Sequence, residues 1–228
     1  MNGFGLGVLL ARERLRSFGA LLVLLLSCTA VYALGVIERR RDATSAADTV
    51  LTGAVFGIAL PLLAYLVSDR VCAGQQLSRS VDVIARYGSD RRATVLGLLL
   101  SSALCMALVA ALLTTAALVG ARTPGSGAFM HDLRISVGIA LLTGEVYALW
   151  FGVASLFGKR GGGRKCALLV DFLLGASSSF LAMPLPRGHV RNLLGGTPVY
   201  GLSQPSAWLA LGVIGVTCLA LSALRTRE

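Results

Sequence analysis

The longest predicted membrane-spanning run of the chain is "ATVLGLLLSSALCMALVAALLTTAALVGA", which extends without a charge from Ala93 to Ala121. A helix rises 1.5 Å per residue, so about 20 apolar residues are enough to cross the hydrocarbon layer of a bilayer. Because lipid offers no hydrogen-bond partner to the backbone, a segment of this kind is expected to be helical. The stretch therefore predicts a transmembrane helix that tilts or extends beyond the bilayer.

The rest of the chain repeats this pattern. Of its 228 residues, 55% are hydrophobic and only 14% are charged, and the charges cluster between long apolar runs. These runs predict six spans, at about residues 18–37, 49–68, 93–121, 135–158, 166–185 and 206–224. The fifth run is the least hydrophobic and the richest in serine, so a count that merges or drops it is the main alternative. The expected fold class is an all-α integral membrane protein with a single transmembrane domain over residues 1–228.

The distribution of lysine and arginine predicts the topology. In a membrane protein a net charge of +10 reports orientation rather than nucleic-acid binding, so no nucleic-acid partner is expected. With six spans, fourteen of the basic residues fall on the side of the N-terminus and seven on the other side. One basic patch falls on the side with fewer basic residues: "ERRR" at residues 38–41, whose positive charge nearby acids partly offset. The positive-inside rule thus places both termini in the cytoplasm of a multi-pass protein of the inner (plasma) membrane.

The loop between the second and third predicted spans contains "GQQLSRSVDVIARYGSDRR", residues 74–92. Its apolar residues Leu77, Val81 and Ile84 recur at i, i+4 and i+7, which is the spacing of one face of a helix. Polar and basic residues occupy much of the remaining surface, and glycines flank the segment. The pattern predicts a short amphipathic helix on the cytoplasmic side.

Spacing alone leaves the role of this segment open. It suits a solvated connector whose arginines anchor the topology and touch lipid phosphates, and it suits equally a docking helix for a cytoplasmic partner. After the segment, Ser89 or Asp90 can provide the N-cap of the third span, because either side chain accepts a hydrogen bond from a free backbone amide.

The layout resembles the permease subunits of type-2 ABC transporters (ABC-2-like exporters). These subunits have six spans, both termini inside, and a charged segment with a short coupling helix between spans two and three. Here Asp69, Arg70 and Gly74 lead into the predicted helix at residues 77–86, and basic residues precede the third span. The chain departs from the pattern at Gln75, where the family commonly has threonine, and its turn lacks the frequent proline.

Two other segments are similar to parts of this family. "FGLGVLLARERLRSF", residues 4–18, resembles the N-terminal amphipathic interfacial helix, with apolar and charged side chains on different sides (Phe4, Val8 and Leu15 against Arg12, Glu13 and Arg16). "MPLPRGHVRNLLGGTPVY", residues 183–200, resembles the outer re-entrant or interfacial segment that precedes the last span.

The chain carries no nucleotide site of its own. Its nearest candidate, "GKRGGGRK" at residues 158–165, lacks the glycine spacing and the serine or threonine of a P-loop. No pair of its five cysteines is spaced as CxxC, so no metal site is indicated. The chain is therefore expected to be no enzyme and to hold no cofactor, with ATP and magnesium bound by a partner.

The resemblance implies what that partner is. A homodimer of the chain, surrounded by membrane lipids, would bind two copies of a cytoplasmic ABC ATPase and export a substrate by alternating access. The residues expected to couple the two proteins are those of the predicted helix: Gln76, Leu77, Arg79, Val81, Asp82, Ile84 and Arg86. The substrate is not indicated.

Two acidic residues fall inside predicted spans. A carboxylate at the depth of Glu145 costs about 2.5–3.5 kcal/mol on insertion scales, so Glu145 is expected to face protein or a wet cavity. There it could belong to the substrate path, or it could be an inter-helix hydrogen-bond partner. Asp171 is expected to pair with Arg164 or Lys165, or to reach the interface near them.

Two alternatives to the exporter remain open. The "GKRGG" turn after span four resembles the fourth loop of haem-exporter-like permeases of cytochrome c maturation. The other alternative is a membrane anchor or assembly factor that does not transport, and it would need no ATPase.

Overall fold

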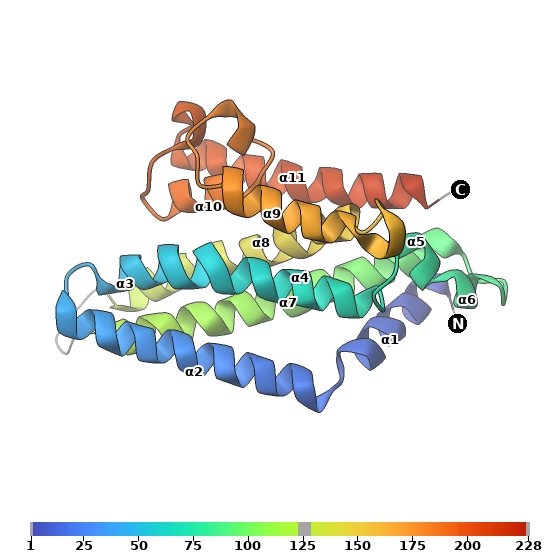
Figure 1. Ribbon diagram of the computed structural model, residues 1–228, viewed down its shortest axis with the longest axis horizontal. Helices are drawn as coiled ribbons and strands as arrows, with labels where there is room; N and C mark the ends of the chain where they lie inside the picture. The colour runs from blue at the N-terminus through green and yellow to red at the C-terminus, as the bar shows by residue number, and fades with distance from the viewer. Residues whose placement is uncertain (1, 123–128, 227–228) are drawn as a thin grey trace.

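The computed structural model describes residues 2–122 and 129–226, and every regular element within these ranges is helical (Figure 1). Among the described residues, five helices are long and apolar enough to cross a membrane. They are α2 (Phe18–Arg41), the continuous helix of α3 (Ala46–Thr49), η1 (Val50–Ala59) and α4 (Leu60–Val71), then α7 (Arg91–Ala121), α8 (Phe129–Ala154) and α11 (Gln204–Arg225). The all-α fold is confirmed, and these helices are compatible with a multi-pass membrane protein.

Six spans are not confirmed, because the predicted fifth span is not one helix. Residues 166–185 contain α9 (Gly163–Leu174), a turn, and the short η3 (Phe180–Ala182). The 12 residues of α9 extend only about 18 Å, well short of the roughly 30 Å hydrocarbon layer. After α9, serine side chains bond to each other across the turn, with 2.9 Å between the Ser177 and Ser179 hydroxyls. Pro184, which cannot donate a backbone hydrogen bond, then prevents the helix from resuming.

The chain returns to α11 through a compact cap over one end of the bundle (Figure 1). The cap contains η3, α10 (Pro186–Leu193) and η4 (Val199–Gly201). The His189 side chain of α10 is fully buried, and its Nε2 lies 2.7 Å from the Met183 carbonyl oxygen. The segment that sequence likened to a re-entrant element is thus a folded helical cap.

Helix α7 is the centre of the bundle, and glycines allow its neighbours to approach its backbone. A Cβ atom on Gly97 would lie 2.2 Å from the Phe4 carbonyl oxygen of α1 (Gly3–Leu15). A Cβ on Gly120 would lie 2.3 Å from the Tyr32 carbonyl oxygen of α2, and Gly144 of α8 approaches α7 equally closely. Because no larger residue fits at these crossings, the glycines set the distance between the helices.

Helix α1 packs against α7 through small residues rather than through its large apolar ones. Its buried residues are Gly3, Gly7 and Ala11, whereas Phe4 and Val8 are exposed. The amphipathic character of the interfacial helix predicted for residues 4–18 is therefore not confirmed. The helix itself ends at Leu15. Backbone groups at Arg16 and Ser17 leave helical geometry and form an elbow before α2.

The second membrane-length helix changes register at its middle. Pro61 has no N–H group, and its ring would collide with the carbonyl group of Gly57 in a regular α-helix. The preceding ten residues, η1, form a π-helix instead, in which the Leu60 N–H bonds to the Val55 carbonyl oxygen. The wider register accommodates the proline without ending the helix.

The start of α1, the end of α11 and three short elements meet at one end of the bundle (Figure 1). The short elements are α5 (Leu77–Ser80), α6 (Asp82–Ala85) and η2 (Lys159–Gly161). We call this the basic end, because its elements and loops carry Arg12, Arg14, Arg16, Arg70, Arg79, Arg86, Arg91, Arg92, Lys159, Arg160, Arg164, Lys165 and Arg225. Arg227, counted with them in the predicted topology, lies outside the described residues. The first residues of α1 and the last residues of α11 are thus on one side of the bundle.

Candidate functional site at the basic end of the bundle

The loop between α4 and α7, residues 72–90, contains the predicted coupling helix. Instead of one helix the structure has two single turns, α5 and α6, separated at Val81 by a backbone with φ −109° and ψ −3°. The flanking glycines Gly74 and Gly88 both adopt the left-handed conformation, with φ of +66° and +83°. Asp90 caps α7 as predicted, since its side chain accepts a hydrogen bond from the Arg92 N–H.

The apolar side chains of this loop face the chain itself. Leu77 and Val81 are fully buried in the main hydrophobic core. The Leu77 N–H also donates to the Ser155 carbonyl oxygen at the end of α8, at 3.1 Å. Neither side chain is therefore available to fill a pocket on another protein in this conformation.

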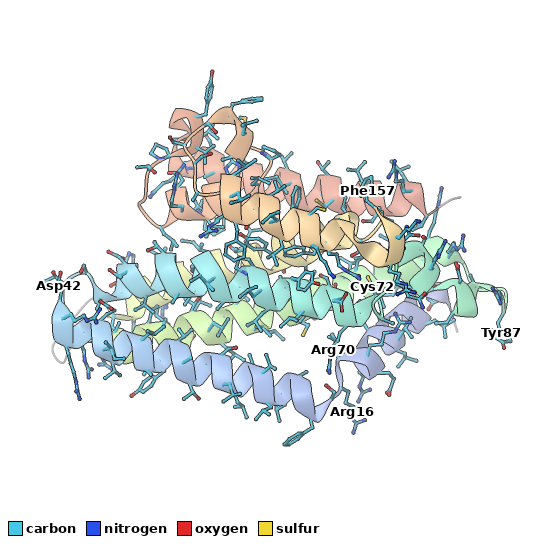
Figure 2. All side chains as sticks on the ribbon, in the orientation of Figure 1. Arg16, Asp42, Arg70, Cys72, Tyr87 and Phe157 are labelled. Atoms are coloured by element: carbon cyan, nitrogen blue, oxygen red, sulfur yellow. The ribbon has the colours of Figure 1, made fainter. Side chains whose placement is uncertain are left out.

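Polar and basic residues form the outer surface of the loop. Arg79 and Arg86 are exposed, and Tyr87, 88% exposed, projects from the end of the bundle (Figure 2). Asp82, Ile84 and Gln76 are half-buried. Of the residues predicted to couple, only the two arginines are fully on the surface. Tyr87 joins them, although the helical pattern gave no reason to single it out.

The other half-buried polar residues connect the loop to its surroundings. The Asp82 carboxylate forms an ion pair with Arg91 at the start of α7. The Gln76 side chain donates from Nε2 to the Gly158 carbonyl oxygen, at 2.6 Å. Arg14 of α1 donates to the carbonyl oxygens of Val71 and Ser80, the latter at 2.9 Å. The loop is thus bonded to α1, α7 and the end of α8.

Arg164, at the start of α9, makes the densest set of contacts in this region. Its side chain is only 2% exposed, and its Nη2 lies 2.7 Å from Oδ1 of Asp69 on α4. Its Nη1 donates to the Gln75 carbonyl oxygen at 3.2 Å and to the Ser155 hydroxyl at 3.3 Å. One buried guanidinium thus joins α4, the α4–α7 loop, α8 and α9.

Sequence reasoning did not single out Arg164 as a site residue and considered it only as a possible partner of Asp171. A signal was present in the three glycines that precede it. Gly161 adopts φ +69°, and a Cβ atom there would lie 2.7 Å from Nη2 of Arg164. The glycines leave the space through which the guanidinium folds back into the bundle.

Cys72 is enclosed by the same contacts. It ends α4 and is only 1% exposed (Figure 2). Burial raises the pKa of its thiol, and the nearby charge of Arg164 opposes that shift only in part. The Cys72 side chain is therefore shielded from solvent by the surrounding loop and helices.

Glu145, which was expected to face protein or a wet cavity, is exposed in the single chain. It lies on the outside of α8, and no hydrogen bond or ion pair reaches it from the described residues. Its neighbours Gly144 and Val146 point to α7 and α11 respectively, toward Met106 and Gly215. The carboxyl group thus emerges between α7 and α11 on the outer surface of the bundle.

Asp171 has different partners from those expected. Arg164 pairs with α4 instead, and Asp171 is fully buried, with its Oδ2 accepting a 2.9 Å hydrogen bond from the Tyr147 hydroxyl of α8. The predicted pairing near Arg164 and Lys165 is therefore wrong. Asp171 joins α9 to α8, while Arg187 of α10 stacks on the neighbouring Phe172 ring, 5.0 Å from its centroid.

Within residues 2–122 and 129–226, no group of three or more His, Cys, Asp or Glu side chains is placed to hold a metal ion. Comparison of the sequence with protein-family models, and with curated proteins, gives no match. The function must therefore be argued from the geometry of the chain itself.

Proposed function

We propose that the chain is the permease subunit of an ATP-driven ABC exporter, coupled at its basic end to a separate cytoplasmic ATPase. The membrane-length helices supply a transmembrane scaffold, and the basic end supplies a docking surface. Both termini, η2 and the α4–α7 loop share that end, which the positive-inside rule assigns to the cytoplasmic face of the inner membrane.

The observation that carries this proposal is the bonding of the α4–α7 loop to the helices around it. Arg164 connects it to α4, α8 and α9, and Arg14 connects it to α1. A connector needs no such bracing. A loop that transmits a displacement from a partner does need these bonds, because a flexible loop would move alone and leave the helices in place.

The docking surface differs from the one expected for the predicted helix. Since Leu77 is buried, the contacts to the ATPase come from the exposed Arg79, Arg86 and Tyr87. Two cations and an aromatic ring fit an acidic, partly apolar groove on the partner. Arginine and tyrosine are also residue types that carry binding energy at protein interfaces.

The second permease copy is proposed to cover Glu145. A mid-span carboxyl group facing lipid is unfavourable, and in a two-fold dimer the same residue of the partner copy can share a hydrogen bond with it. The structural role of Glu145 as an inter-helix contact is thus favoured over a place in a substrate path, and the contact lies between subunits.

The proposal is tested by co-expressing the tagged chain with ABC ATPases of the same genome and measuring which ATPase co-purifies. Arg86→Glu and Arg79→Glu should reduce the retained ATPase at least ten-fold, because each places an acid against an acidic groove. Lys165→Glu is the matched control: it reverses an exposed charge at the same end but outside the loop.

If no ATPase co-purifies with the unmodified chain, the anchor or assembly role predicted as an alternative is supported and the exporter is rejected. The haem-exporter-like alternative shares the same docking prediction. Dependence of cytochrome c maturation on the chain would favour it over an exporter of another substrate.

A further inference from the structure

A groove opens on the side of the bundle between α2 and the other helices. The elbow, α2, α4 and α7 form its walls, and its volume is about 940 Å³. That volume lies at the upper end of the range for small-molecule sites, which is about 300–1,000 Å³. The groove exists because α2 packs closely only in its second half, where Val31 and Gly35 are its buried residues.

The long wall of the groove is apolar. Its side chains come from three helices and include Leu21, Leu24, Leu63, Leu66, Val67 and Val109. In a membrane such a wall faces acyl chains, so lipid is the occupant that the surroundings supply.

The mouth of the groove is basic. Arg16 and Arg70 both line it, and both lie beside the elbow (Figure 2). The Arg70 guanidinium contacts the Ser17 hydroxyl across the mouth. Asp69 also lines the mouth, but its carboxylate is paired with Arg164 at 2.7 Å and does not neutralise Arg70.

The two arginines are at headgroup depth. Arg16 precedes the first residue of α2 by two positions, and Arg70 is the penultimate residue of α4. Both membrane-length helices therefore end where these guanidinium groups lie. A ligand that fills the groove has its apolar part between the helices and its polar part beside two cations.

We infer that this groove binds an anionic phospholipid, with its acyl chains against α2, α4 and α7 and its phosphate between Arg16 and Arg70. Guanidinium groups bind phosphate oxygens through charge-assisted hydrogen bonds. The inference is independent of the proposed transport function, since it concerns only the lipid-facing side of the bundle.

The test uses tryptophan quenching by brominated lipids in vesicles. Trp150 and Trp208 are first replaced by phenylalanine, and Leu66→Trp then reports from the groove. The matched control is Leu221→Trp on α11. Leu66 and Leu221 are 47% and 45% exposed, and each lies four residues before an arginine at the basic end.

Brominated phosphatidylglycerol should quench Leu66→Trp more strongly than brominated phosphatidylcholine at equal mole fraction. A basic residue beside an anionic lipid contributes about five-fold in binding, so Arg16→Gln or Arg70→Gln should each lower the preference by about that factor. Neither change should alter the preference reported by Leu221→Trp. Within the described residues the Arg16 side chain makes no hydrogen bond or ion pair, so at least that variant should fold normally.

Three results would each overturn the inference. Equal quenching by the two lipids at Leu66→Trp, or a preference that survives both arginine changes, would show that only unselected boundary lipid fills the groove. Loss of the preference on adding inorganic phosphate, compared with chloride at matched ionic strength, would show that the arginines bind free anions rather than a lipid.

Discussion

Replacing Arg164 with alanine should lower the melting temperature of the detergent-purified protein by about 4–12 °C. The substitution removes the ion pair with Asp69 and the donors to the Gln75 carbonyl and the Ser155 hydroxyl. Because these acceptors belong to separate segments, no single neighbour can move to satisfy them all.

The magnitude follows from the burial of each partner. Removing one member of a buried ion pair costs about 3–5 kcal/mol when the other charge stays buried. Asp69 is 44% exposed and can be partly rehydrated, so we expect about 2–3 kcal/mol. For a chain of this length each kcal/mol shifts the melting temperature by about 2–4 °C, which gives the stated range.

The assay is thermal unfolding followed by the appearance of buried thiols, with Lys159→Ala as the control. Lys159 is exposed in the same turn, so its removal changes the net charge equally without touching the buried contacts. Arg164→Lys should fall between the two, because it keeps the charge but loses the fork of donors. If Arg164→Ala melts within about 1 °C of Lys159→Ala, the reasoning that this guanidinium braces the loop is refuted.

Three further predictions concern other parts of the bundle. At neutral pH, Cys72 should react with a water-soluble maleimide far more slowly than the exposed Cys166. Because burial raises the pKa of the Cys72 thiol and leaves less thiolate at a given pH, its reaction rate should keep rising with pH beyond the ordinary thiol range. Equal rates at both cysteines would contradict the burial of Cys72. Glu145→Gln should preserve a homodimer detected by cross-linking in membranes. Glu145→Leu should weaken dimerisation by about five-fold, which corresponds to about 1 kcal/mol for an inter-helix hydrogen bond. Unchanged dimerisation in the leucine variant would show that Glu145 is not in the dimer interface. Gly144→Ala should destabilise the protein by about 1–3 kcal/mol in thermal unfolding, because the new Cβ would lie 2.4 Å from a backbone oxygen of α7. The control Gly138→Ala, on the same helix but with open space around it, should be neutral or slightly stabilising. A similar loss of stability in both variants would show that the close helix crossing is not the cause.

The sequence alone was sufficient for features that depend on local chemistry. A long uncharged run must form a helix in lipid, so the helical class and the approximate bounds of α2, α7, α8 and α11 follow from composition. The cap at Asp90 likewise depends only on its own side chain and the two amides that follow. Each of these features involves residues within a few positions of one another.

The fifth predicted span shows where local reasoning stops. Its composition permits a helix of membrane length, yet α9 ends at Leu174 and the chain folds into a cap on α8 and α11 instead. Mean hydropathy over a window does not register the end of a helix at a serine turn. Whether residues 166–185 form a span or lead into the cap depends on whether α10 can bury its own face against the bundle.

Which partner each polar or apolar face meets was decided only by the tertiary structure. The spacing of Leu77 and Val81 marks an apolar face, but burial in the same chain and burial in another protein give the same spacing. Charged residues are equally ambiguous in sequence. Arg164, expected in a loop, is buried, whereas Glu145, expected within a span, is exposed. A sequence records the character of each side chain, whereas its environment depends on distant residues that meet when the helices cross, such as Ser68 and Arg164, which are 96 positions apart.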